Sequence, residues 1–396
     1  MENKVIYENN TDTIFDDDSQ NEPREGYGFD EYEITATPSD FNIATLFSFI
    51  ESGVVTIPGF QRNYVWDHGR ASKLIESLII GLPVPQIFLY EQSRNKFLII
   101  DGQQRMMSIY YFIKEIFPKM EKRAALRKIF AKHNRIPDEI LNDNKYYSDF
   151  SLYLPTKLPK RQNKLHGLTY STLDEYKVSF DLRTIRNVII KQMLPKDDDS
   201  SIYEIFNRLN TGGVNLTDQE IRMSLHHSDF MNMLSRVNAN SKWRKLIKLD
   251  EPDIHMKDIE ILLRAFAMLI KGDNYTPSML KFLNGFAKDK KTENHEQISY
   301  LETLFYSFLD SCSLLQENIF LVSSNRFSIT LFESVFYAAC YKPYLNTELI
   351  SGNIDNDSII QLKNNETFKQ VSIGKTTNTQ NVKKRLHIAL DIVKIK

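Results

Sequence analysis

The run Phe97–Ile100 constrains the fold of this chain more than any other segment. Its four residues are all apolar, so a strand formed here has no polar face to turn toward water. Such a strand is buried on both of its faces. A second apolar run, Gln86–Glu91, precedes it across the polar residues 92–95, and the two predict an antiparallel hairpin. We therefore expect a compact unit of strands and helices around residues 97–100.

Cap and turn residues predict the neighbouring elements. They indicate a helix capped by Ser39 and ending at Gly53, a helix capped by Asp67 and ending at Gly81, and a helix over 103–117. Strands are expected at 54–57 and 184–194. The sequence is helical from about 200 to 341, polar and loop-like over 346–365, and ends in an amphipathic helix.

The expected fold class is therefore α+β, a small mixed sheet-and-helix domain followed by a mainly helical domain. The expected division is a disordered acidic tail at 1–31, the mixed domain at 32–195 with a basic insertion at about 118–166, a helical domain at 196–345, and a loop with a C-terminal helix at 346–396.

Charge is distributed unevenly along the chain. Residues 1–31 hold ten acidic and two basic side chains, a net of −8, so the remainder carries −1 − (−8) = +7. Residues 118–166 hold 12 basic and 5 acidic side chains, also +7. This segment suits a polyanion partner, although a solvated helical face explains most charge runs.

Composition indicates the compartment. No apolar run reaches the roughly 20 residues that span a bilayer, and the N-terminus has no signal segment. Cys312 and Cys340 lie in apolar helical stretches, so we expect buried thiols in a reducing environment. These features predict a cytoplasmic protein without a membrane partner.

The residues that follow the buried strand can trap an anion. Asp101 and Gly102 predict a turn, and the helix beginning at Gln103 directs free N–H groups and a positive dipole outward. Gln103 and Gln104 offer amides, and Arg105 offers a planar fork suited to phosphate. A cation in the first helical turn opposes the dipole, which makes sense if an anion binds there. The alternative is that Asp101 caps the helix and pairs with Arg105.

A second arginine lies in the segment Ile57–Trp66, where Gln61 and Arg62 follow the first strand. If the strands pair in one sheet, Arg62 converges on the same anion as Arg105. The alternative is that the aromatic residues of this segment pack as a plug and Arg62 reaches solvent.

Four runs carry a family resemblance: Ile57–Trp66, Leu74–Glu91, Ile99–Phe112 and Phe206–Arg222. They resemble the N-terminal domain of GmrSD-type restriction endonucleases, over about residues 40–270. The resemblance implies a ParB/sulfiredoxin-like fold and binding and hydrolysis of a nucleoside triphosphate, tied to recognition and cleavage of foreign DNA in phage defence. By position, it assigns the nucleotide site to Asp101, Gly102, Gln103, Gln104 and Arg105, with Arg62 nearby.

A second motif contributes candidates from the helical part. Thr217 and Glu220 form the pattern of a capping box, which explains both without a ligand. Arg208, Asn210 and Arg222 match the family motif, and we expect them to complete the nucleotide pocket.

Two weaker signals are interpreted as structural. Gly374–Thr377, Gly-Lys-Thr-Thr, resembles half of a phosphate-binding loop but lacks the glycine five residues earlier. None of the eight histidines shows metal-ligand spacing, and we expect the His-Asn-His nuclease domain that many relatives carry to be absent.

The leading hypothesis is a nucleoside triphosphatase or nucleotide-gated switch in a defence system. Asp101 and Arg105 are its catalytic candidates, Asp101 is the candidate ligand of Mg²⁺, and DNA and a separate nuclease chain are the expected partners. One alternative is a Mg²⁺-dependent ParB-like nuclease acting at the same cleft. Another is a non-catalytic module that binds DNA or a partner protein.

Overall fold

The chain forms two compact units in a computed structural model. The structure describes residues 15–16, 32–57, 64–123, 125–126, 129, 137–155, 163–194, 201–209, 217–253, 255–322 and 326–396. The N-terminal unit comprises residues 26–225, and the helical unit comprises residues 226–396 together with the first 25 residues. The division lies after Leu225, whereas the sequence placed the start of the helical domain near residue 196.

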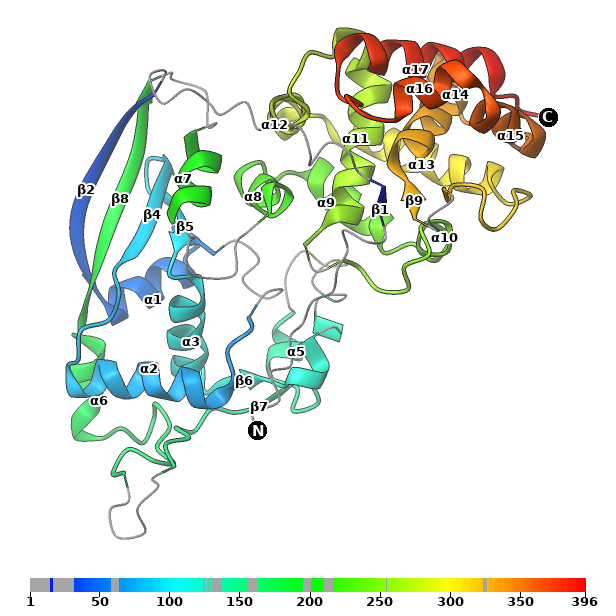
Figure 1. Ribbon diagram of the computed structural model, residues 1–396. Coiled ribbons are helices and arrows are strands. Elements are labelled where there is room, and N and C mark those ends of the chain that lie inside the picture. The colour runs from blue at the N-terminus through cyan, green and yellow to red at the C-terminus, as the bar shows by residue number, and fades with distance from the viewer. Residues whose placement is uncertain are drawn as a thin grey trace. The chain divides into compact units, whose positions relative to one another are not determined.

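The N-terminal unit contains most of the strands (Figure 1). Its strands are β2 (Glu33–Asn42), β3 (Val55–Thr56), β4 (Ile87–Ser93), β5 (Lys96–Asp101), β6 (Ile116–Pro118), β7 (Tyr147–Asp149) and β8 (Thr184–Leu194). Its helices are α1 (Ile43–Glu51), α2 (His68–Ile80), α3 (Gln103–Ile113), the 3₁₀ helix η4 (Met120–Lys122), α5 (Asp138–Leu141), α6 (Glu175–Asp181), α7 (Ser201–Leu209) and α8 (Asp218–Leu225).

Five strands form one mixed sheet in the order β2-β8-β4-β5-β3. The pair β4–β5 is antiparallel, which confirms the predicted hairpin, and β8 coincides with the predicted strand at 184–194. The pairs β4–β8 and β3–β5 are parallel, while β2 and β8 are antiparallel. The carboxyl ends of β3 and β5 therefore lie at the same edge of the sheet. A mixed sheet followed by a helical region confirms the α+β class.

Strand β5 is buried on both faces, as its sequence predicts. Ile99 belongs to a core cluster that also contains side chains of α1, α2, α3 and α6. Leu98 and Ile100 point to the opposite face, because successive side chains of a strand alternate. Both are buried outside that cluster, and α7 packs against β5. Helices on the two faces thus explain why residues 97–100 carry no polar side chain.

Helix α2 confirms its predicted ends. The Asp67 carboxylate accepts from the backbone N–H of Arg70 at 2.7 Å, and Gly81 closes the helix in the left-handed region with φ 87°. The helix start predicted at Ser39 is wrong, because that residue lies in β2 opposite Asn187. Asn42 caps α1 instead, accepting from Thr45 N–H at 2.8 Å.

One further boundary differs from prediction. Helix α3 ends at Ile113 rather than near residue 117, because the chain turns through Glu115 at φ 57° and continues as β6, which pairs with β7. The basic insertion at about 118–166 lies partly outside the described residues. Its described part holds the strand β7 and the helices η4 and α5.

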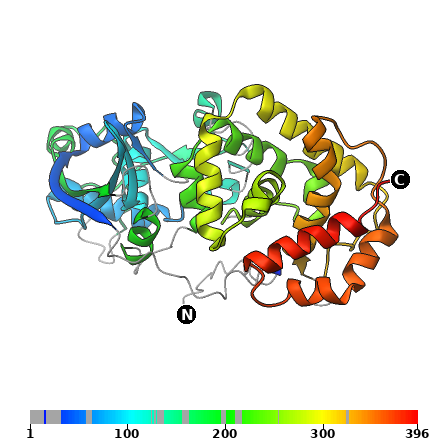
Figure 2. The same cartoon turned by 90° about the horizontal axis from the view of Figure 1, so that it is seen from above.

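The helical unit is built from α9 to α17 (Figure 2). Its helices are α9 (Asp229–Asn238), α10 (Ser241–Leu246), α11 (Lys257–Lys271), η5 (Gly272–Asn274), α12 (Met279–Asp289), η6 (Lys290–Thr292), α13 (His295–Ser311), α14 (Ile329–Asn346), α15 (Asn356–Asn364), α16 (Glu366–Ser372) and α17 (Thr379–Ile392). Two short strands, β1 (Phe15–Asp16) and β9 (Phe327–Ser328), pair with each other.

The predictions for the ends of the chain are corrected in part. The polar segment 346–365 is not only loop, because residues 356–364 form α15 and bury Ile359 and Leu362. Phe15 and Asp16 form a strand within the predicted disordered tail, and the remainder of 1–31 lies outside the described residues. Cys312 and Cys340 are buried free thiols, as expected. Among the described helices, none has the length and hydropathy that crossing a bilayer requires.

A buried ion cluster links three helices of the helical unit. Glu333 on α14 accepts from Arg264 on α11 at 3.1 Å and from Arg385 on α17 at 3.0 Å. All three side chains are at most 2% exposed. Burial lowers the pKa of Arg385 from its usual value, and the neighbouring Glu333 carboxylate opposes this shift.

The same arginine binds the Gly-Lys-Thr-Thr segment from inside. Arg385 donates to the backbone carbonyls of Val371 and Thr376, at 3.3 and 3.0 Å. The Tyr275 hydroxyl donates to the carbonyl of Thr377 at 2.7 Å, and both threonines are buried. This segment therefore serves as a structural loop, in agreement with its interpretation from the sequence.

His68 makes the stability of the N-terminal unit depend on pH. Its ring stacks on Phe117 with 4.8 Å between centroids, and its Nε2 lies 2.7 Å from the carbonyl oxygen of Ser151. Burial lowers the pKa of His68 below its usual 6.5, so the unfolded chain takes up a proton first as the pH falls. The stabilisation is complete above pH 6.5 and is lost as the pH falls from 6.5 through the lower pKa of the folded state.

We expect the difference in unfolding free energy between wild type and His68→Gln to shrink from pH 7.5 to pH 5.5. Urea unfolding monitored at both pH values measures it. Burial also lowers the pKa of His227, so wild type alone is no test. A difference that does not change with pH would contradict the assignment to His68.

Candidate functional site

The turn after β5 has the geometry that the sequence predicts. Gly102 adopts φ 99° and precedes α3, whose first turn has no side-chain cap. A Cβ placed on Gly102 would lie 2.9 Å from Cγ1 of Ile87, which is closer than packing allows. Only glycine therefore fits this turn, and it leaves the first N–H groups of α3 without a capping side chain.

The guanidinium of Arg105 lies over this turn. Its Nη2 is 3.1 Å from the position that a Cβ on Gly102 would take. Nη2 also donates to Asp101 Oδ2 and to the carbonyl of Gln86, each at 3.0 Å. The pairing of Asp101 with Arg105, one of the two alternatives from the sequence, is thus present. Arg105 Nε is buried and has no hydrogen-bond partner within the described part of the chain.

The two glutamines that follow Gly102 have different roles. Gln104 Oε1 accepts from the backbone N–H of Val65 at 3.0 Å. One turn later the Ser108 hydroxyl lies 2.9 Å from the hydroxyl of Tyr64. Gln103 Nε2 is buried, and among the described residues it has no acceptor. Gln104 therefore connects residue 65 to the start of α3, whereas the side-chain N–H groups of Gln103 can still donate to a ligand.

Gln61 and Arg62 lie outside the described residues, but the residues flanking them are described. Residue 57 follows β3, whose carboxyl end is at the same sheet edge as that of β5. Residues 64 and 65 bind the first two turns of α3. The flank at 64–65 therefore contacts α3, and the flank at 57 lies at the sheet edge that leads into the Asp101–Arg105 turn, although the position of Arg62 stays a prediction.

The candidates from the second motif are distributed differently. Arg208 is exposed on α7, and Asn210 lies outside the described residues. Arg222 is only 1% exposed and donates to Gln219 of the same helix. Thr217 and Glu220 form the predicted capping box, with Thr217 N–H to Glu220 Oε2 at 2.8 Å and Glu220 N–H to Thr217 Oγ1 at 3.3 Å. The part of Arg208, Asn210 and Arg222 in a nucleotide pocket stays a prediction.

Two residues of this site were missed from the sequence, Gln86 and Ile87. Gln86 supplies the carbonyl that binds Arg105, and Ile87 supplies the surface beneath Gly102. The register of the β4–β5 hairpin is the sequence signal that could have identified these two residues. Phe88 pairs with Asp101, so the residues before it run alongside those after Asp101.

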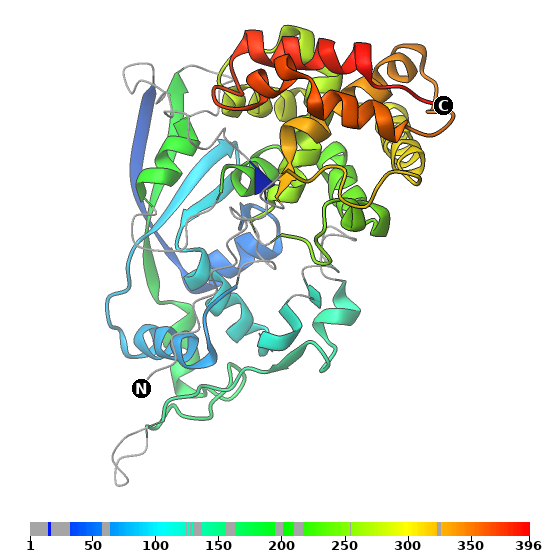
Figure 3. The same ribbon diagram turned by 45° about the vertical axis from the view of Figure 1, so that its right-hand side comes forward.

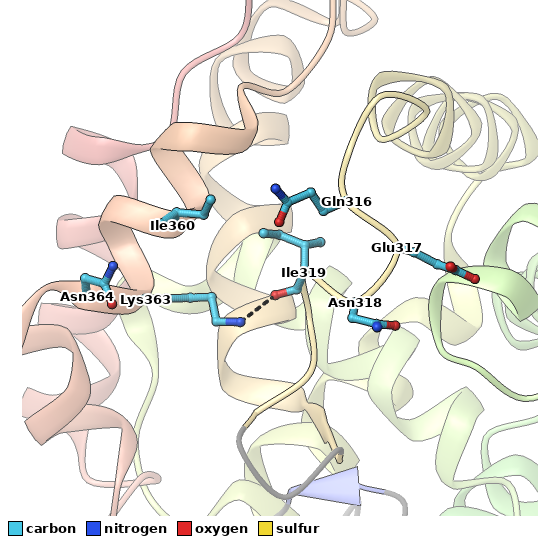
Figure 4. A pocket seen from close by; sticks show the side chains of 7 residues that line it. All are labelled: Gln316, Glu317, Asn318, Ile319, Ile360, Lys363 and Asn364. Carbon is cyan, nitrogen blue, oxygen red and sulfur yellow. Dashed lines mark hydrogen bonds between the residues drawn. The ribbon is translucent and has the colours of Figure 1, made fainter.

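The helical unit contains a separate cavity of about 320 Å³ (Figure 4). It lies between the segment after α13 and helix α15, and none of the predicted site residues lines it. Lys363 donates there to the carbonyls of Ile319 and Leu321, at 3.1 and 2.9 Å. Through these two bonds Lys363 connects α15 to the segment after α13 and stabilises the cavity wall. Over the described residues, no cluster of three or more His, Cys, Asp or Glu side chains is arranged for a metal ion.

Together these features define a mixed α+β domain. Its buried strand β5 is joined by Gly102 to helix α3, whose start has no side-chain cap and lies beside the guanidinium of Arg105. Residues 43–227 match the family model for the N-terminal domain of the GmrSD restriction endonuclease. The resemblance found in the sequence is confirmed for this stretch, which carries that domain and connects the chain with DNA restriction systems. The match runs from the first residue of α1 to just past α8.

No curated protein and no solved structure matches the chain. The ParB/sulfiredoxin-like fold therefore stays an expectation from the family resemblance.

Proposed function

We propose that the N-terminal unit binds a nucleoside triphosphate at the start of α3, and that binding and hydrolysis control a DNA restriction step. The observation that carries the proposal is Arg105, whose guanidinium lies over Gly102 and the uncapped helix start. A helix start with its N–H groups available favours phosphate, and an arginine placed over it favours the same ligand.

The ion pair with Asp101 does not exclude this ligand. The side chains of Asp101 and Arg105 are 36% and 16% exposed, and a single ion pair that is still partly open to solvent contributes about 1 kcal/mol. A polyphosphate at the helix start replaces one carboxylate with several charged oxygens. Arg105 Nε and Gln103 Nε2 are further donors on the same turn.

Mg²⁺ belongs to the proposal because triphosphates bind with it. Asp101 is the candidate ligand, and the ion would neutralise phosphate charge. The fit is incomplete, since Asp101 Oδ2 is held 3.0 Å from the Arg105 cation. Direct ligation through that oxygen requires the arginine to move toward the phosphate.

Arg105→Ala is expected to lower triphosphate affinity by at least tenfold, because it removes the guanidinium that lies over the turn. Isothermal titration with each of the four triphosphates, with Mg²⁺ present, measures the loss. The matched control is Arg186→Ala, because Arg186 is a surface arginine of the same unit, 68% exposed and 3.5 Å from Asp40. Unchanged binding in Arg105→Ala, with the circular dichroism spectrum preserved, would remove this site assignment.

The same preparations separate nucleotide control from direct DNA cleavage. With plasmid and Mg²⁺, the proposal expects any cleavage by a partner nuclease to depend on nucleotide. Nicking that persists without nucleotide but disappears in Asp101→Asn would identify the chain as a nuclease acting at this turn. Salt-sensitive DNA binding without nucleotide turnover would instead indicate a non-catalytic module.

A further inference from the structure

The cavity of about 320 Å³ in the helical unit has two walls that are joined by hydrogen bonds (Figure 4). One wall is the segment 316–319, and the other is α15, which packs against α16 and α17 (Figure 3). At the start of α15, Asn356 Oδ1 accepts from the backbone N–H of Gln316 at 3.1 Å. Near the end of this helix, Lys363 donates to two carbonyls of the facing chain. The cavity is therefore formed without a ligand, as most small-molecule sites are.

Lys363 brings to this cavity a positive charge that no carboxylate compensates. Its two acceptors, the carbonyls of Ile319 and Leu321, are neutral, and across the described residues Lys363 has no ion pair. Two other poorly exposed lysines of the same unit, Lys257 and Lys290, each pair with a glutamate three residues later. Burial lowers the pKa of Lys363 from its usual value, as expected for a cation whose charge is not offset.

One donor of this cation is available to a ligand. A lysine ammonium has three N–H groups, and the two carbonyls occupy two of them. The side-chain amides of Gln316 and Asn364 line the same cavity and can donate or accept. The lining is therefore polar beside the cation, and an anion bound there would meet further donors.

Glu317 also lines the cavity but does not neutralise Lys363. Its carboxylate lies 2.7 Å from Nζ of Lys248, and this hydrogen bond lowers the pKa of Glu317. Figure 4 shows the Glu317 carboxylate pointing away from Lys363. The charge of Glu317 is thus offset by Lys248, and the charge of Lys363 remains.

Charge and shape indicate the class of ligand. A single cation with one open donor suits a monocarboxylate, whereas a phosphate carries more charge and accepts from several donors. Ile319 and Ile360 offer an apolar surface to the rest of the molecule. At roughly 30 Å³ for each non-hydrogen atom, the volume of a water molecule in the liquid, the cavity holds about ten such atoms.

We infer that this cavity binds a small organic monocarboxylate. Its carboxylate accepts from Lys363, and its apolar part lies against Ile319 and Ile360. The bound molecule adds contacts between the segment 316–319 and α15, so its binding stabilises the helical unit. This site belongs to the helical unit and does not depend on triphosphate binding at the start of α3.

Isothermal titration of the full chain with benzoate and with hexanoate tests the inference. Each probe has one carboxylate and an apolar part small enough for the cavity. At least one of them is expected to bind, at least tenfold more tightly than its neutral amide, benzamide or hexanamide. Absence of binding by both carboxylates, or equal binding of the acid and its amide, would overturn the inference.

Two substitutions locate the binding. Lys363→Met keeps an aliphatic side chain but removes the cation, and Gln316→Glu adds a competing carboxylate at an exposed position of the lining. Each is expected to weaken the carboxylate at least tenfold. Lys369→Met is the matched control, because Lys369 pairs with Glu366 on α16 and does not line the cavity. Circular dichroism checks the fold, and binding retained in both cavity variants would contradict the assignment.

Two further measurements separate the remaining outcomes. Inorganic phosphate that binds as tightly as the carboxylate, and is lost in Lys363→Met, would replace the carboxylate by a phosphate ligand. The carboxylate that binds is also expected to raise the melting temperature of wild type but not of Lys363→Met. An equal rise in the two proteins would reject binding at Lys363.

Discussion

Replacement of Glu333 by glutamine is expected to lower the free energy of unfolding of the helical unit by about 3–5 kcal/mol. The substitution preserves size but leaves the guanidinium groups of Arg264 and Arg385 buried without their shared carboxylate. Removing one partner of a buried ion cluster costs the desolvation that its charge had offset. Trp243 reports on this region by fluorescence, because its ring lies 5.1 Å from that of Phe332, the preceding residue.

The matched control is Glu366→Gln in the same unit. Glu366 is 80% exposed, and within the described part of the chain its one ion pair is with Lys369, one turn away on α16. Its loss should therefore change stability by less than about 0.5 kcal/mol. A loss below about 1 kcal/mol in Glu333→Gln would mean that carbonyl groups, rather than the carboxylate, compensate the two arginines.

Gly102→Ala is expected to destabilise the N-terminal unit by about 2–4 kcal/mol. The left-handed backbone at φ 99° disfavours any side chain, and the new Cβ meets Ile87 Cγ1 at 2.9 Å. Ile87 is fully buried and cannot move away freely. Urea unfolding followed by Trp66 fluorescence measures the change. Loss of triphosphate binding should accompany it, because the start of α3 shifts.

Gly167→Ala separates strain from collision. Gly167 has φ 84° in the same unit, but a Cβ there meets nothing within 4 Å. It should show only the conformational cost of about 1–2 kcal/mol. Equal losses in the two variants would show that Ile87 yields, and that the contact beneath the turn is not rigid.

Local signals predicted the elements whose ends are set by their own residues. Asp67 and Gly81 determine α2 by a side-chain cap and a left-handed terminus, and both are local properties. The hairpin and β8 followed from apolar runs. Ser39 does not cap a helix, because it lies in β2 and pairs with Asn187 of β8, a residue far away in sequence. Such long-range strand pairing overrides a local capping preference.

The candidate site was also predictable only where local residues determine it, and not where it depends on pairing between strands. The sequence indicated the glycine turn, the helix start and the two uses of Arg105. It could not choose between them, because the carbonyl of Gln86 that binds this arginine depends on strand register. It also gave no sign that Gln104 anchors Val65 rather than a ligand.

The loop that Arg385 holds shows how a sequence likeness can mislead. A loop that grips phosphate turns its amide hydrogens toward a negative guest. In residues 371–377 the carbonyl oxygens of Val371 and Thr376 turn inward, toward the fully buried guanidinium of Arg385. The peptide groups are thus oriented opposite to those of a phosphate-binding loop, and they bind a side chain of the protein itself, Arg385. The direction of the peptide groups in such a loop therefore indicates its role better than its glycine, lysine and threonine residues do.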